Sequence, residues 1–179
     1  MEPREEVRPF FVRYDYARAR ARLLIKEFGL TAPPVDVEAI LKARGAVVRR
    51  HAIKEIDYAV TFFYRDRYYV SVNVCNPGRD RWSFAHELGH VELGHYLTYD
   101  LDTLADDRLT EKERRILDRE ADVFARDLLM PAKWVRSAAG GPARFETIDE
   151  LADMFGVSWE AMMIRMDELG LFPKDMAVR

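Results

Sequence analysis

The sequence has very little cysteine and no long apolar run. Cys75 is the only cysteine among 179 residues, which excludes an internal disulfide and suits a reducing compartment. We interpret it as a small apolar residue at the end of a strand. No run of about 18 apolar residues occurs, and the opening MEPREEVRPFFV contains no apolar core of signal-peptide length. We therefore expect a cytoplasmic protein without a membrane segment.

A strong net charge is lacking as well. The 28 Lys and Arg residues nearly balance the 31 Asp and Glu residues, and the formal net charge is -3. Such a balance gives no general attraction to nucleic acid or to anionic membranes, so no direct nucleic-acid binding is expected. Arginines do gather near the start of the chain, where we interpret them as a solvated helix face: Arg4, Arg8, Arg13, Arg18, Arg20 and Arg22.

Capping residues, chain breakers and β-branched runs predict an α+β fold. Strands are expected over residues 46–50, 56–64 and 68–74, the last two joined as a hairpin through Arg65, Asp66 and Arg67 in a small antiparallel sheet. Helices are expected over 14–28, after Pro34 with Asp36 as N-cap, over 81–96, from Thr110 to Met130, from Thr147, and from the Ser158 cap to about Leu169. We divide the chain into a main domain, 1–140, and a C-terminal helical segment packed on it, 141–179.

The chain holds four histidines, and three of them lie in the segment RWSFAHELGHVELGH at 81–95. His86 and His90 are four residues apart, so a helix puts both imidazoles on one face and turns Glu87 about a quarter-turn aside. The pattern H-E-x-x-H is typical of two neutral imidazoles that bind one zinc ion beside a glutamate that carries a proton. The alternative is a histidine pair that has helical spacing and no function.

A catalytic zinc ion needs a third protein ligand and an open position. The long metzincin pattern fails, because Leu93 and Tyr96 stand where that pattern requires glycine and histidine. Glu120 lies within the apolar stripe of the helix over 110–130, and a bare carboxylate there is costly unless something positive meets it. We therefore expect Glu120 to be the third ligand. The alternative is an ion pair with a buried arginine such as Arg81.

Two further roles on the same helix follow from its helical pattern. Asp118 and Asp122 are expected on the opposite, solvated face. Asp127 lies near the face of Glu120 and is expected to accept a hydrogen bond from a ligand imidazole. With zinc bound, Glu87 would move a proton from a water whose pKa is lowered to about 7 to the leaving amine of a cleaved peptide.

Three blocks of the sequence resemble the ImmA/IrrE metallopeptidases: RWSFAHELGHVELGH at 81–95, EADVFARDLLMP at 120–131 and LADMFGVSWEAMMIRMDELGLF at 151–172. The resemblance implies a zincin-like core with His86, His90 and Glu120 as zinc ligands and Glu87 as the catalytic residue. It also implies a zinc-dependent endopeptidase of bacteria or phages that acts on a regulatory protein, with a helix-turn-helix repressor as the substrate.

Two alternatives concern the partner. Residues 147–170 resemble a helix-turn-helix, but six acids against Arg165 alone oppose phosphate contacts. The chain could also be a metal-binding regulatory interaction module without proteolytic activity, which a closed site with four protein ligands would favour.

YYVSVNV at 68–74 is either an edge strand that binds an extended substrate or a core strand.

Overall fold

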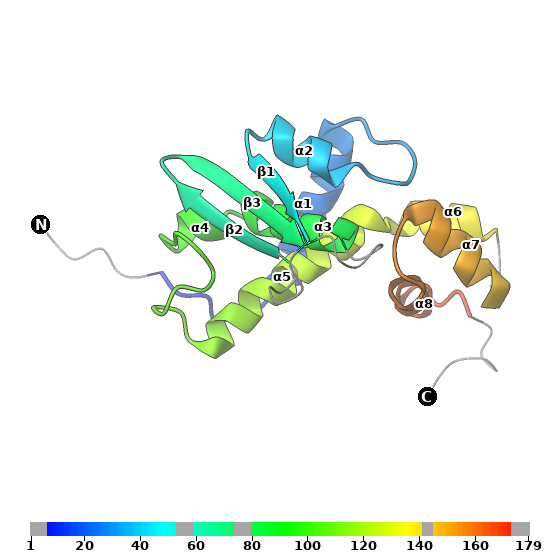
Figure 1. Ribbon diagram of the computed structural model, residues 1–179. Helices are drawn as coiled ribbons and strands as arrows, with labels where there is room; N and C mark the ends of the chain where they lie inside the picture. Colours follow the sequence, from blue (N-terminus) through cyan, green and yellow to red (C-terminus); the bar gives the residue numbers. More distant parts are fainter. Residues whose placement is uncertain (1–6, 53–58, 74–79, 141–144, 173–179) are drawn as a thin grey trace, which may run out of the picture.

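The computed structural model describes residues 7–52, 59–73, 80–140 and 145–172. Cys75 lies outside the described residues. The helices and strands of the structure, in chain order, are α1 (Tyr14–Glu27), α2 (Val37–Ala43), β1 (Val47–His51), β2 (Ala59–Tyr64), β3 (Arg67–Asn73), α3 (Asp80–Glu92), α4 (His95–Thr98), α5 (Glu111–Leu129), α6 (Ala132–Ala139), α7 (Phe145–Phe155) and α8 (Trp159–Glu168). Figure 1 shows the sheet beside α3 and α5, with α6, α7 and α8 gathered near the C-terminal end of α5. The α+β class is confirmed.

The sheet is mixed, so the expected antiparallel sheet is wrong in part. β2 and β3 form the predicted hairpin, and its two-residue turn places Arg65 and Asp66 at positive φ. The strand order is β1-β3-β2, and β1 runs parallel to β3. β1 thus pairs with the side of β3 that faces away from β2. β3 is therefore central, with Val70 and Val72 buried, which favours the core alternative for YYVSVNV over the edge-strand alternative.

Three helices, α2, α5 and α8, begin where a side chain caps the free backbone groups. Asp36 accepts a hydrogen bond from the Ala39 amide at the start of α2, and Thr110 and Glu113 form the predicted capping box of α5. Ser158 caps α8. Two predictions need correction: α7 begins before Thr147, and α6 was not anticipated.

The C-terminal helices share the core of the rest of the chain. Ile148 and Phe155 of α7 and Met162 of α8 belong to the same buried cluster as α3 and α5. Arg165 of α8 is buried and donates to the Met130 carbonyl at 3.0 Å and to the Asp127 carboxylate at 3.1 Å. The boundary drawn after residue 140 stays a prediction.

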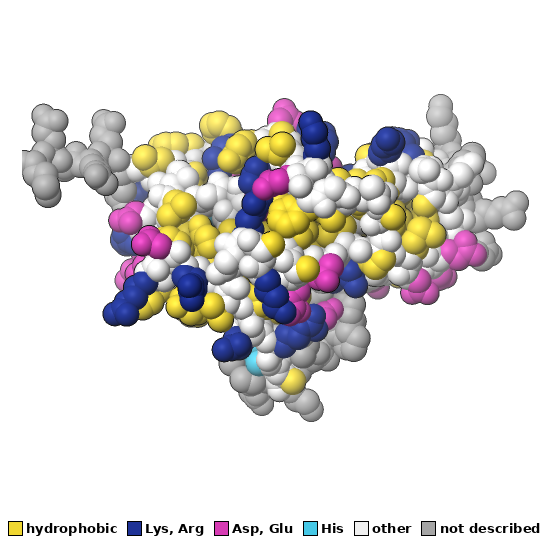
Figure 2. All heavy atoms as spheres, turned by 90° about the horizontal axis from the view of Figure 1, so that it is seen from above, with side chains coloured by type: hydrophobic (Ala, Val, Ile, Leu, Met, Phe, Trp, Pro, Cys, Tyr) yellow, Lys and Arg dark blue, Asp and Glu magenta, His cyan; other side chains and the backbone are white. Residues whose placement is uncertain are grey.

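Charge and hydropathy of the described residues can be compared with those of proteins that bind nucleic acid or cross a membrane. On the face shown in Figure 2, basic and acidic side chains are interspersed, so this face presents no field of one sign to nucleic acid. Among the described residues, no helix combines the length and apolar character needed to cross a membrane.

Helices α3 and α5 approach each other closely at Gly89. A Cβ atom on Gly89 would lie 3.0 Å from the Ala121 Cα and 3.1 Å from its carbonyl oxygen. Both neighbours are backbone atoms, which cannot rotate away as a side chain can. The missing side chain therefore sets the distance between the histidines of α3 and the acids of α5.

Gly89→Ala is expected to destabilise the protein, because α5 has to move away from α3. Overpacking of this kind costs about 1–3 kcal/mol. Thermal unfolding of the metal-free protein measures it, and Gly140→Ala offers a control because no atom lies within 4 Å of a Cβ there, although its positive φ adds backbone strain. Equal stability of Gly89→Ala and the wild type would show that the contact between the helices is loose.

Candidate metal centre

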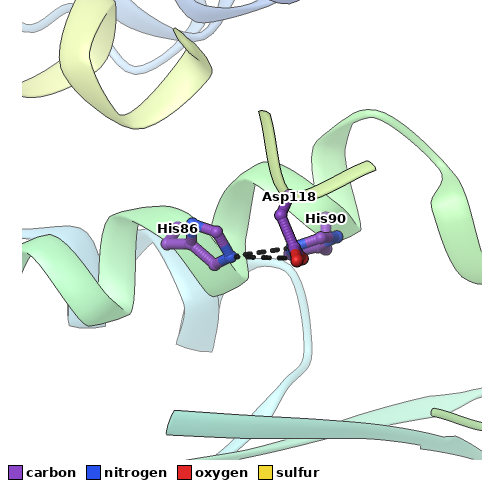
Figure 3. Close-up of side chains that lie close together, drawn as sticks. All are labelled: His86, His90 and Asp118. Atoms are coloured by element: carbon purple, nitrogen blue, oxygen red, sulfur yellow. Dashed lines mark hydrogen bonds and ion pairs between the residues drawn. The ribbon is translucent and has the colours of Figure 1, made fainter. Parts of the chain in front are cut away.

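Two imidazoles from α3 and one carboxylate from α5 meet at a single point (Figure 3). The Nε2 atoms of His86 and His90 are 3.0 Å apart. The Asp118 Oδ1 atom lies 3.6 Å from the His90 Nε2 and 3.9 Å from the His86 Nε2. Among the described residues, these three form the only group of at least three His, Cys, Asp or Glu whose ligand atoms converge closely enough to hold a metal ion.

Asp118 and Asp122 lie at the border between the buried and solvated faces of α5. The prediction that both point to the opposite, solvated face is wrong, because their partly exposed side chains face the histidines of α3. The Asp122 carboxylate lies 3.0 Å from the Nδ1 of His86. An acid pair four residues apart on α5 thus meets the histidine pair four residues apart on α3. That matching spacing is the sequence signal that could have identified Asp118.

Glu120 has different partners from those expected. Its side chain is 1% exposed and accepts hydrogen bonds from the Arg13 backbone amide and Nη2, both at 2.7 Å, and from the Arg13 Nε at 2.9 Å. The Nε2 of His95 lies 3.1 Å from the same carboxylate. The alternative of an arginine partner thus matches the structure, although the arginine is Arg13, while Arg81 donates to the Val35 carbonyl. The structure does not bring Glu120 into the group formed by His86 and His90.

The Glu120 carboxylate is ionised in this setting. Burial alone would raise its pKa, but the hydrogen bonds from His95 and Arg13 outweigh burial and lower the pKa to about 2. Asp127 also departs from its expected role. Its carboxylate binds Arg165 and Arg126 and not a ligand imidazole.

The helix that carries the histidines ends earlier than predicted. α3 stops at Glu92, Gly94 takes a φ of 70°, and α4 begins at His95. The prediction of one helix to about Tyr96 is therefore wrong at its end. The break brings the Nδ1 of His95 to 2.8 Å from the Nδ1 of His90.

Burial and local charge favour neutral rings at His90 and His95. Burial lowers the pKa of His90 well below its usual range, and the charges of His86 and His95 lower it further. Burial also lowers the pKa of His95, although the hydrogen bond to Glu120 opposes this. Neutral imidazole is the form that binds a metal ion.

The other side of the centre is rich in negative charge. At His86, burial opposes protonation, but the hydrogen bond to Asp122 and the charges of Glu87, Asp122 and Asp118 outweigh burial and raise the pKa. Burial raises the pKa of Asp118, and the charge of Asp122 raises it further, although His86 opposes both. Several acids around one partly buried imidazole suit a bound cation.

Glu87 points from α3 toward the sheet and not toward α5. It is buried, and its Oε2 atom accepts a hydrogen bond of 2.6 Å from the Thr61 hydroxyl of β2. Burial raises the pKa of Glu87, while the charge of His86 and the Thr61 hydrogen bond oppose this. Glu87 thus lies beside the histidine pair without joining it, as expected from its place in the helix.

Comparisons with known proteins concern the family and the fold of the chain. Residues 41–167, which include His86, Glu87, His90 and Asp118, match the Peptidase_M78 family model, described as the IrrE N-terminal-like domain. No curated protein matches the sequence at a significant level. A solved structure, a transcriptional regulator from Mycobacterium tuberculosis, is similar with a TM-score of 0.62 and 21% identity over 87% of this chain and 47% of that one. At this identity the likeness shows the fold, and the chain spans about half the length of that structure.

Proposed function

The chain belongs to the IrrE N-terminal-like family, Peptidase_M78, and on that premise we propose that it is a zinc-dependent endopeptidase. His86, His90 and Asp118 would bind the metal ion, and Glu87 would carry the proton. One observation supports this most strongly: two ring nitrogens from α3 and a carboxylate oxygen from α5 converge next to a buried glutamate. Asp118 replaces Glu120 in the ligand set, because the Glu120 carboxylate is held by Arg13 and His95.

The residues fit a zinc ion. Zinc–nitrogen and zinc–oxygen bonds of about 2.0–2.2 Å in tetrahedral geometry put two ligand atoms about 3.3 Å apart. The three separations at this centre are 3.0, 3.6 and 3.9 Å, so small movements of the side chains suffice. Two imidazoles and one carboxylate form a three-ligand set of the kind used by hydrolytic zinc enzymes, which keep a fourth position for water or substrate.

A bound zinc ion supplies Lewis acidity, because it lowers the pKa of water to about 7 and polarises a peptide carbonyl. Glu87 accepts the proton of the attacking water on its carboxylate and then donates it to the leaving amine. A raised pKa makes the Glu87 carboxylate a stronger base than that of an exposed glutamate, which favours its uptake of the proton from water. The Thr61 hydroxyl holds the Oε2 atom and so fixes the orientation of the carboxylate.

The substrate proposed here is a regulatory protein, and more narrowly a helix-turn-helix repressor. This choice follows from the family resemblance of the three sequence blocks. A protein partner is also in line with the acidic helices α7 and α8, which do not suit nucleic acid.

Metal removal tests the proposed activity. The zinc-loaded and the chelator-treated protein are incubated with the intact helix-turn-helix repressors of the source genome, and new N-termini are identified by mass spectrometry. We expect cleavage of a repressor by the loaded protein, its loss on chelation, and its return when zinc is added. Stoichiometric zinc binding without cleavage of any of these repressors would contradict the proposal and favour the interaction module.

A further inference from the structure

We propose that Arg13, Glu120 and His95 form a buried chain of hydrogen bonds that fixes the tautomer and the orientation of His90. The three are positioning residues, since only His90 is proposed to touch the metal ion. This inference rests on the proposed metal site. It gives a role to Glu120 and His95, which the chemistry described above leaves unused.

This series of hydrogen bonds begins outside the metal centre, at Arg13, the residue that precedes α1. Arg13 directs its backbone amide and two guanidinium nitrogens at the Glu120 carboxylate, with the Nη2 at 2.7 Å and the Nε at 2.9 Å from different oxygens. A bidentate arginine contact of this kind holds a carboxylate in a defined plane. Glu120 is thereby fixed in position and ionised.

An ionised carboxylate can only accept hydrogen bonds, which orders the protons along the chain. Facing Glu120 at 3.1 Å, the Nε2 of His95 must be a donor. In a neutral imidazole the other nitrogen is then an acceptor, so the Nδ1 of His95 accepts. The Nδ1 of His90, at 2.8 Å, must therefore donate. This leaves a lone pair on the Nε2 of His90, the atom that faces His86 and Asp118.

The opposite tautomer of His90 would point a hydrogen into the centre and could not bind a metal ion there. His86 reaches the same state more directly, because its Nδ1 lies 3.0 Å from the Asp122 carboxylate. His90 is fully buried and has no carboxylate beside its Nδ1 among the described contacts, so His95 relays the effect of Glu120. Arg13 balances the charge of Glu120, so the series of hydrogen bonds orients His90 without adding net charge beside it.

A break in the helix at Gly94 allows the contact between His95 and His90. In a continuous helix His95 would lie about 140° around the axis from His90, because successive residues are about 100° apart. The positive φ of Gly94 ends the helix and starts α4, which turns His95 back onto His90. Both rings are fully buried, so water cannot replace either partner without opening the core.

Two substitutions at His95 test the relay. His95→Leu removes the acceptor for the His90 Nδ1, whereas His95→Asn can place its Oδ1 atom there. We expect zinc affinity, measured by competition with a chromophoric chelator, to fall about 10- to 100-fold in His95→Leu and to recover largely in His95→Asn. A purely structural role for His95 would lower thermal stability in both variants without this difference in affinity.

A matched pair on α5 provides the control. Glu120→Gln and Asp127→Asn each remove the charge of a buried carboxylate that binds arginine, but only Glu120 contacts His95. We expect both variants to lose stability and only Glu120→Gln to lose zinc affinity. Equal affinity of Glu120→Gln, His95→Leu and the wild type would overturn the relay.

The tautomer can be read directly in the metal-free wild type. Long-range ¹H–¹⁵N spectra should show His90 protonated at Nδ1 and His95 protonated at Nε2, and His90 protonated at Nε2 would overturn the inference even if no variant folds. Failure of the wild type to bind zinc would instead contradict the proposed function. The two failures are therefore distinguishable.

Discussion

Glu87→Gln is expected to bind zinc as tightly as the wild type and to lose about 10²- to 10⁴-fold in kcat, the usual contribution of a general acid or base. The amide has nearly the same shape as the carboxylate and can still accept the Thr61 hydrogen bond through its carbonyl oxygen. It cannot accept a proton from water. Bound zinc and cleavage rate, measured on the same preparation, separate the two effects.

Glu92→Gln is the matched control for this substitution. Glu92 is a buried glutamate on the same helix, but it binds Arg20 and Arg44 and not the centre. We expect Glu92→Gln to lose stability and to keep its kcat per folded molecule. If Glu87→Gln cleaved the substrate at the wild-type rate, Glu87 would not be the proton carrier.

Asp118→Asn is expected to weaken zinc binding more than Glu120→Gln does, because Asp118 would contact the metal ion and Glu120 would only orient a ligand. Removal of an orienting partner costs about 10- to 100-fold in affinity, and loss of an anionic ligand should exceed this. The Asp118 side chain is 49% exposed, so the metal-free stability should change by no more than about 0.5 kcal/mol. Chelator competition and thermal unfolding of the metal-free protein measure the two quantities.

The order of the two effects on zinc affinity decides between the ligand sets. A larger loss of zinc affinity in Glu120→Gln than in Asp118→Asn would support Glu120 as the third ligand, as the sequence pattern predicted. Asp122→Asn completes the series, since Asp122 orients His86 and should resemble Glu120→Gln in the size of its effect.

Local signals in the sequence predicted most of the helices and the hairpin. Caps at Asp36, Thr110 and Ser158 act through side-chain bonds to nearby amides, so a few residues suffice to locate them. The side on which β1 joins the sheet depends on the path of the chain in space, and no short pattern encodes it. The early end of α3 at Glu92 was missed because the residues around Gly94 do not by themselves exclude a helix.

The candidate site was predictable to the extent that one helix defines it. His86, Glu87 and His90 take their relative positions from helical spacing alone. The interpretation of Glu120 was sound in one respect, since a buried carboxylate does have a positive partner. That partner is Arg13, which is 107 residues away and had been expected on a solvated face. Asp118 was not predicted as a ligand, because the sequence does not distinguish a half-exposed acid at the border of a helix face from a fully solvated one.

The most direct test is an anomalous difference map at the zinc edge from a crystal of the zinc-loaded wild type. We expect one peak bonded to the Nε2 atoms of His86 and His90 and to the carboxylate of Asp118, with Glu120 still bound to Arg13 and His95. A peak bonded to Glu120, or one that lies away from both histidines, would contradict the proposed centre.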